Sequence, residues 1–262
     1  MGKTEKKKKQ DPLDSTMSLG DHLEELRARL ILAIIGLVIG AVICLIFGPR
    51  ILAFIQRPYY AQTDDKLIVI GVADSFIAYM KISLLSGLIL TSPWVFYQLW
   101  MFVAAGLYEN ERRYVKIAVP FSVTLFVTGA LFFLFFVAPL SIKFFLKFGE
   151  WVDVETSWTL QKYVSFITLL MLVFGLGFQT PIAIFILNRT GLVSIEALRR
   201  SRKYVFLSVF IVAAVATPPD VISQITLAFP LYALFELGIL ISNVVEKKKK
   251  SQDIKDKEDN KD

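Results

Sequence analysis

The chain has 262 residues, of which 55% are hydrophobic. Its mean hydropathy of +0.58 excludes a soluble globular domain and indicates an integral membrane protein. One Cys and one His exclude an internal disulfide and a metal site built from Cys or His. The net charge of +6 is typical of basic segments that face anionic lipid, so nucleic acid is not expected as a partner.

Six apolar segments follow one another and are predicted to be transmembrane helices. They cover residues 28–47, 76–102, 115–140, 163–187, 204–216 and 221–241. The first four reach the roughly 20 residues that a spanning helix needs, whereas the fifth is short and is stopped by the Thr-Pro-Pro-Asp string at 217–220. We therefore predict an all-α integral membrane domain over residues 18–245, in which the last two helices are short.

The distribution of charged residues predicts disordered tails and the orientation of the chain in the membrane. Residues 1–17 and 246–262 are rich in Lys, Asp and Glu, so both tails are predicted to be disordered. The Lys-rich start leads into no small-residue cleavage site, so no cleaved signal peptide is expected. Most of the 29 Lys and Arg residues fall in the tails and in the loops after the second and fourth segments. The positive-inside rule then predicts cytoplasmic termini and an even number of spans.

Enzyme signatures are missing from the sequence. It has no G-x-x-x-x-G-K-[ST] phosphate loop, no H-E-x-x-H zinc motif and no G-x-S-x-G nucleophile elbow. Asp74 and Asp220 fall at predicted helix–loop boundaries outside the apolar segments, so they make a poor catalytic pair. We therefore predict no enzymatic activity, no catalytic residue, no metal and no cofactor.

Acidic residues at the predicted cytoplasmic end have two interpretations. Glu25 and Arg29 are four residues apart, so they can form a local ion pair on one helix face. Glu111 lies beside two Arg residues between the second and third segments, where a solvated loop charge is the simplest interpretation. Alternatively, two carboxylates on this basic face form a site for a cationic peptide, because a guanidinium binds a carboxylate through paired hydrogen bonds.

Polar residues inside the apolar segments are also candidates for a function. Gln179 can form a hydrogen bond between helices of this protein or contact another subunit, and neither is favoured. Glu236 lies midway along a short apolar helix, where an ionised carboxylate is costly. We expect it to be protonated, near thinned and wet membrane, or paired with a partner helix.

Five strings resemble one family, in that family's order. The H-L-x-E-L-R-x-R signature of the TatC subunit of the twin-arginine protein translocase resembles residues 22–30, HLEELRARL. Its S-P-x-x-x-Y-Q-x-W-x-F and L-Y-x-x-E-R-R segments resemble 92–102, SPWVFYQLWMF, and 107–113, LYENERR. Its last two helices resemble 217–224, TPPDVISQ, and 230–236, PLYALFE. The chain is thereby identified as a TatC-like protein.

The resemblance implies a concave, glove-like bundle of six helices in the cell membrane. Such a protein is the receptor and core of a translocase for folded precursors, whose signal peptide carries two adjacent arginines. The proton-motive force drives the export. The implied partners are the signal peptides, single-span subunits of the TatA and TatB types that dock at the short last helices, other copies of the chain, and lipid. The runner-up is a secondary transporter or channel for a small solute.

The resemblance also implies roles for residues at the cytoplasmic end. Glu25 and Glu111 match the two carboxylates that bind the signal arginines. Arg27 and Phe102 match further residues of this region, and Phe102 is expected to pack beside the signal peptide. These four residues form the predicted signal-peptide site.

Other matched positions are polar residues in the membrane and at the outer face. Gln179 matches a buried position that is often Glu, and Glu236 is the second intramembrane candidate for partner contact. Asp220 and Gln224 match the outer-face loop between the last two helices. The chain departs from many members at Gln179 and at Ala105, which stands where they have Pro. A titrating carboxylate and a rigid turn are therefore not expected there.

Overall fold

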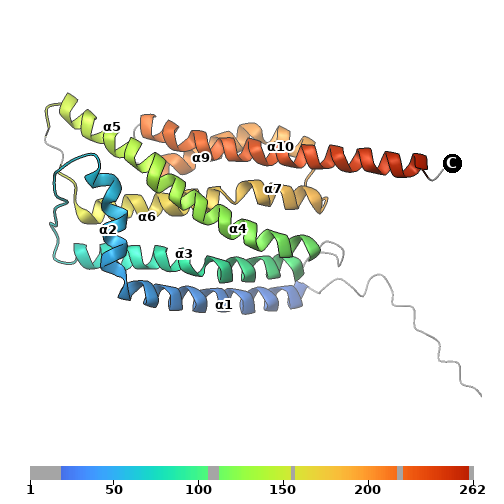
Figure 1. The fold of residues 1–262 in the computed structure, drawn as a ribbon, viewed down its shortest axis with the longest axis horizontal. Helices are drawn as coiled ribbons and strands as arrows, with labels where there is room; N and C mark the ends of the chain where they lie inside the picture. Colours follow the sequence, from blue (N-terminus) through green and yellow to red (C-terminus); the bar gives the residue numbers. More distant parts are fainter. Residues whose placement is uncertain (1–18, 106–111, 155–156, 217–220, 260–262) are drawn as a thin grey trace, which may run out of the picture.

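The computed structural model is a bundle of helices aligned along one long axis, and it describes residues 19–105, 112–154, 157–216 and 221–259 (Figure 1). The elements are α1 (Leu19–Ile46), α2 (Gly48–Tyr60), α3 (Asp74–Ala105), α4 (Arg112–Phe132), η1 (Phe133–Val137), α5 (Ala138–Trp151), α6 (Leu160–Gly177), α7 (Thr180–Arg189), α8 (Ile195–Arg200), α9 (Arg202–Ala216) and α10 (Val221–Asp259). Within these residues the β pairing is a single bridge between Ile68 and Thr159. The all-α prediction is confirmed.

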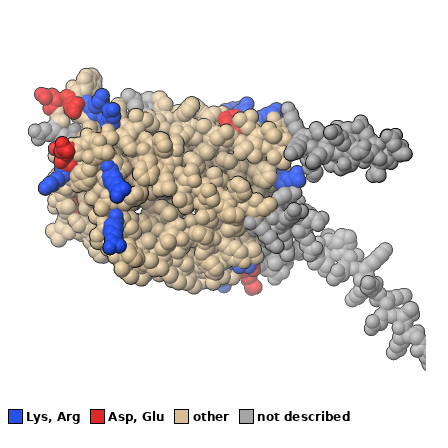
Figure 2. Space-filling model, in the orientation of Figure 1, with Lys and Arg blue, Asp and Glu red and all other residues tan. Residues whose placement is uncertain are grey.

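Five helical stretches of the described chain are long and apolar enough to cross a membrane. They are Leu23–Ile46, Asp74–Ala104, Ile117–Trp151, Leu160–Arg189 and Gln224–Glu246. The sixth helix is α9, whose 15 residues extend about 22 Å, less than the roughly 30 Å of a hydrocarbon core. Figure 2 shows a band without Lys, Arg, Asp or Glu between two ends that carry these residues, as expected for a surface that contacts lipid.

The seam between α1 and α3 is closely packed because small residues line it. A Cβ atom built on Gly87 would lie 2.5 Å from the backbone nitrogen of Ala41, so the two backbones nearly touch. Gly40 faces the same seam, and the Trp94 indole Nε1 donates a hydrogen bond to the Leu32 carbonyl at 2.9 Å. Small residues allow such close approach in membrane helices. Since α3 is the main neighbour of α1, this seam fixes where the start of α1 lies.

At the end of the bundle opposite to the start of α1, α2 lies across the long axis of the bundle (Figure 1). Its buried residues Ile55 and Tyr59 are four apart and therefore share one helix face. The Tyr163 hydroxyl donates to the Ile55 carbonyl at 2.6 Å, and the Tyr79 hydroxyl donates to the Leu45 carbonyl. The bond from Tyr163 of α6 holds α2 crosswise, whereas the bond from Tyr79 of α3 fixes the last turn of α1, directly before α2. The predicted segments contain no helix here.

Three helices differ from the segments predicted for them. α4, η1 and α5 form one continuous rod that is longer than the predicted 115–140, because the apolar pattern continues through Phe148. The predicted 163–187 is divided at Gln179, and Pro181, which lacks an N–H, starts the second part. α10 continues to Asp259 through residues predicted to be disordered. Lys and acidic residues recur there three and four positions apart, a spacing that supports a helix. The predicted disordered stretch 1–17 lies outside the described residues.

Candidate functional site

The end of the bundle at which α1 begins brings the predicted acidic residue Glu25 against α3. Arg29 Nε lies 2.6 Å from Glu25 Oε1, and Arg29 Nη1 donates to Gln98 Oε1 at 3.1 Å. The side chains of Glu25 and Arg29 are 28% and 25% exposed, whereas Gln98 is 1% exposed. The local ion pair between Glu25 and Arg29 is therefore present. Gln98, which anchors it to α3, was not predicted as a site residue.

The antiparallel register of α1 and α3 sets the level of Phe102. One turn of α1 before Arg29 is Glu25, and one turn of α3 after Gln98 is Phe102. The Arg29–Gln98 contact therefore brings Phe102 to the level of Glu25 along the bundle axis. Phe102 is half-buried, while Arg27 is exposed. The predicted site residues on α1 and α3 thus lie at one end of the same helix pair.

Glu111, the fourth predicted site residue, lies outside the described residues. α3 ends at Ala105 and α4 begins at Arg112, both at the end of the bundle where α1 begins (Figure 1). The described ends of α3 and α4 on either side of Glu111 thus lie at the same end of the bundle as Glu25. A cationic peptide bound at this end would lie near the Glu25 carboxylate and at the same height along the bundle axis as Phe102.

Deeper in the bundle, Ser122 of α4 joins three helices through hydrogen bonds. Trp100 Nε1 of α3 donates to Ser122 Oγ at 2.8 Å, and Gln179 Nε2 donates to the Ser122 carbonyl at 3.0 Å. Ser122 is fully buried, so neither of these two polar atoms has ready access to water. The amide of Gln179 thus bonds within this protein, which is one of its two predicted roles. A contact of Gln179 with another subunit stays a prediction.

Glu236 is paired inside the chain. Arg202 Nη2, from the first residue of α9, lies 2.7 Å from Glu236 Oε2, and the Tyr232 hydroxyl donates to Glu236 Oε1 at 2.9 Å. Of the three situations expected for Glu236, the structure therefore has pairing with a neighbouring helix. In the first turn of α10, Gln224 Nε2 donates to the Phe210 carbonyl at 3.0 Å and ties α10 to α9 again. Asp220 lies outside the described residues.

Arg202→Gln is expected to destabilise the α9–α10 hairpin by about 1 kcal/mol, because Glu236 loses its charged partner. The value is small because the Arg202 and Glu236 side chains are 47% and 28% exposed. Thermal unfolding of Arg202→Gln, Glu236→Gln and the double variant measures the coupling. Additive effects of the two single changes would show that the pair contributes nothing to stability.

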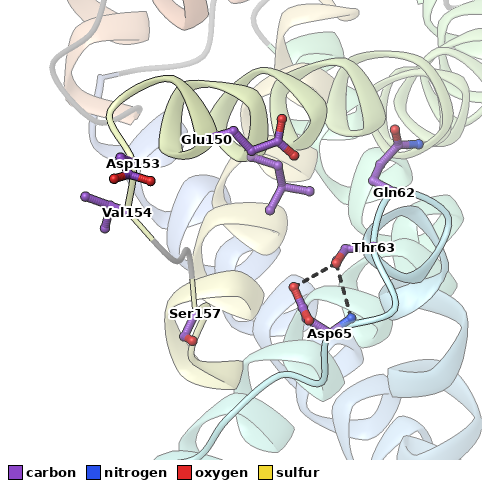
Figure 3. Close-up of a pocket in the computed structure, with 8 residues that line it drawn as sticks. Gln62, Thr63, Asp65, Glu150, Asp153, Val154 and Ser157 are labelled. Carbon is purple, nitrogen blue, oxygen red and sulfur yellow. Dashed lines mark hydrogen bonds between the residues drawn. The ribbon is translucent and has the colours of Figure 1, made fainter.

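Polar residues line an open hollow at the end of the bundle opposite to the start of α1 (Figure 1 and Figure 3). It has a volume of about 620 Å³, and its lining includes the carboxylates of Asp65, Glu150 and Asp153. Thr63 Oγ1 donates to Asp65 Oδ2 at 3.0 Å and accepts from the Asp65 amide at 3.2 Å, so this carboxylate is already engaged locally. Among the described residues, no three His, Cys, Asp or Glu side chains are grouped so that they could hold a metal ion.

Known proteins are similar to the chain along most of its length. A family model described as Sec-independent protein translocase protein (TatC) matches residues 21–230. A protein named TatC from Desulforapulum autotrophicum is 39% identical over 235 residues, which are 89% of this chain and 87% of that protein. Another from Carboxydothermus hydrogenoformans is 38% identical over 237 residues, 90% of this chain and 96% of that protein. A crystal structure described as the twin arginine translocase receptor TatC superposes with a TM-score of 0.78 at 34% identity, covering 85% of this chain and 98% of that one.

Proposed function

The chain belongs to the TatC family of Sec-independent protein translocase proteins, and on this premise we propose that it is the signal-peptide receptor and core of a twin-arginine translocase. It is a multi-pass membrane protein of this system. Family membership decides against the alternative of a secondary transporter or channel for a small solute. In this proposal the chain binds and assembles, and it catalyses no reaction of its own.

The observation that carries the proposal is the partly exposed Glu25 carboxylate at the end of the α1–α3 pair. A carboxylate there can accept two parallel hydrogen bonds from one guanidinium of a signal peptide. Glu111 supplies a second carboxylate for the second arginine, and Arg27 and the half-buried Phe102 lie beside the bound peptide. Two adjacent arginines would thus meet two carboxylates on a face that is otherwise basic, so recognition depends on geometry as well as charge.

The proposed receptor has both termini in the cytoplasm and lies in the cell membrane. The excess of Lys and Arg at the end that carries Glu25 supports this orientation. The short α9 and its partner α10 form the edge at which single-span subunits of the TatA and TatB types dock, and Gln179 is a further candidate contact. The proton-motive force then drives export of the folded precursor.

Changing both signal arginines to lysines is expected to weaken binding at least tenfold at equal peptide charge. A lysine ammonium is a point charge and cannot reproduce the two parallel bonds of a guanidinium to one carboxylate. Fluorescence anisotropy with the purified chain in detergent and two labelled peptides, matched except at these two residues, gives the ratio of Kd values. Equal affinity for the two peptides would contradict the proposed readout of guanidinium geometry.

A further inference from the structure

The Glu25 carboxylate already holds a guanidinium that belongs to the chain itself. Arg29 Nε approaches Glu25 Oε1 to 2.6 Å, a close charge-assisted contact between the guanidinium and the carboxylate. This contact joins one nitrogen of the guanidinium to one oxygen of the carboxylate. Glu25 Oε2 is therefore the atom at which a second guanidinium can begin to bind.

A second contact keeps the Arg29 head in place independently of Glu25. Arg29 Nη1 donates to Gln98 Oε1 at 3.1 Å, and Gln98 is 1% exposed within α3. A buried amide oxygen keeps its donor, because losing it would leave a polar atom unsatisfied away from water. Arg29 can therefore turn away from Glu25 while Nη1 stays on Gln98, without releasing its charge into the apolar part of the bundle.

We propose that Arg29 is an internal competitor that sets the affinity of the site: it occupies Glu25 in the free chain and is exchanged for a signal arginine. This inference rests on the proposed function of Glu25 as a signal-binding carboxylate. Two guanidinium groups crowded on one carboxylate repel each other, so binding of the signal requires the Nε contact of Arg29 to loosen. Arg29 then rotates away from Glu25 while its Nη1 stays bonded to Gln98, and the signal arginine binds both oxygens of the Glu25 carboxylate.

The exchange sets how tightly the receptor binds any cationic signal. A signal arginine replaces one guanidinium contact by a two-bond contact of the same chemical kind, so the exchange is favourable. A lysine ammonium offers one directed contact and must displace the same guanidinium to make it. The free energy of releasing Arg29 is the same for both ligands, so the internal arginine weakens both by the same factor and keeps the weaker one, the lysine pair, from occupying the site.

The test compares the twin-arginine and twin-lysine peptides on wild type, Arg29→Gln and Arg29→Lys. With Arg29→Gln, affinity is expected to rise about tenfold for both peptides, so the ratio of their Kd values stays within about twofold of wild type. Arg29→Lys keeps the positive charge but removes the guanidinium fork, so it holds Glu25 more weakly and both affinities are expected to rise about threefold. A general electrostatic role of Arg29 predicts that Arg29→Lys binds both peptides like wild type, which would overturn the exchange. Arg50→Gln at the opposite end removes one charge as a control.

The results separate this inference from the proposed function. If Arg29→Gln weakens the binding of both peptides, or leaves both Kd values unchanged, Arg29 is not a competitor and the exchange is wrong. The same titration with Glu25→Gln reports on the function itself. Loss of arginine-peptide binding in Glu25→Gln together with unchanged Kd values in Arg29→Gln overturns only the exchange. Unaltered binding by Glu25→Gln overturns the assignment of Glu25 and the exchange with it.

Discussion

Glu25→Gln and Glu111→Gln are each expected to raise the Kd for a twin-arginine peptide by roughly 30-fold. Glutamine keeps the shape of the side chain but replaces the charge-assisted bonds by weaker neutral ones. A hydrogen bond to a charged group contributes about 2 kcal/mol, and each 1.4 kcal/mol changes an affinity about tenfold. Titration calorimetry on the purified variants in detergent measures the change.

Glu24→Gln is the matched control for this prediction. Glu24 is the neighbour of Glu25 on α1, it is exposed, and its replacement removes the same charge from the same end of the bundle. We expect its Kd to stay within about twofold of wild type, because exposed charges are well screened. Wild-type binding by both Glu25→Gln and Glu111→Gln would show that the signal arginines bind elsewhere.

Gly87→Ala is expected to destabilise the protein by about 2 kcal/mol, the typical cost of overpacking a tight contact. The new Cβ would lie 2.5 Å from the nitrogen and 2.7 Å from the Cα of Ala41, so α1 and α3 must separate. Separation also moves Arg29 relative to Gln98, so peptide binding should weaken with stability. Thermal unfolding in detergent and the peptide titration measure the two effects on the same sample.

Gly177→Ala provides the comparison at a second closely packed glycine. Its new Cβ would meet the end of the Leu231 side chain, which can rotate away, and not a backbone. We expect a loss of stability well below that of Gly87→Ala and no change in peptide binding. Equal destabilisation by the two changes would mean that the α1–α3 seam is no tighter than an ordinary side-chain contact.

The helices of the bundle could be predicted because each apolar segment is a local signal. The ion pair of Glu25 and Arg29 could be predicted for the same reason, since both residues lie on one face of one helix. Gln98 could not, because its contact with Arg29 joins residues 69 apart and depends on the register of α1 against α3. The register is set by the close approach of Gly87 to Ala41, and no pattern in the sequence shows which residue of α1 packs against Gly87.

Other parts of the structure were missed for different reasons. The crosswise helix α2 is short and contains Pro58 and two charged residues, so it is not a continuous apolar segment of transmembrane length, although Ile55 and Tyr59 share a face. The pair of Arg202 and Glu236 needs the turn between α9 and α10 to bring two helices together. Arg202 lies among several basic residues of one loop, and the sequence distinguishes it from its neighbours only by its place at the start of α9.

Photo-crosslinking tests most directly whether the end of the bundle that carries Glu25 reads the arginine pair. A photoreactive amino acid replaces Phe102 in one variant and the fully exposed Val72, at the opposite end, in another. Our account predicts that the Phe102 variant crosslinks to a twin-arginine peptide next to its arginines, that the twin-lysine peptide gives much less product, and that the Val72 variant gives none. Crosslinking at position 72 with none at position 102 would contradict it.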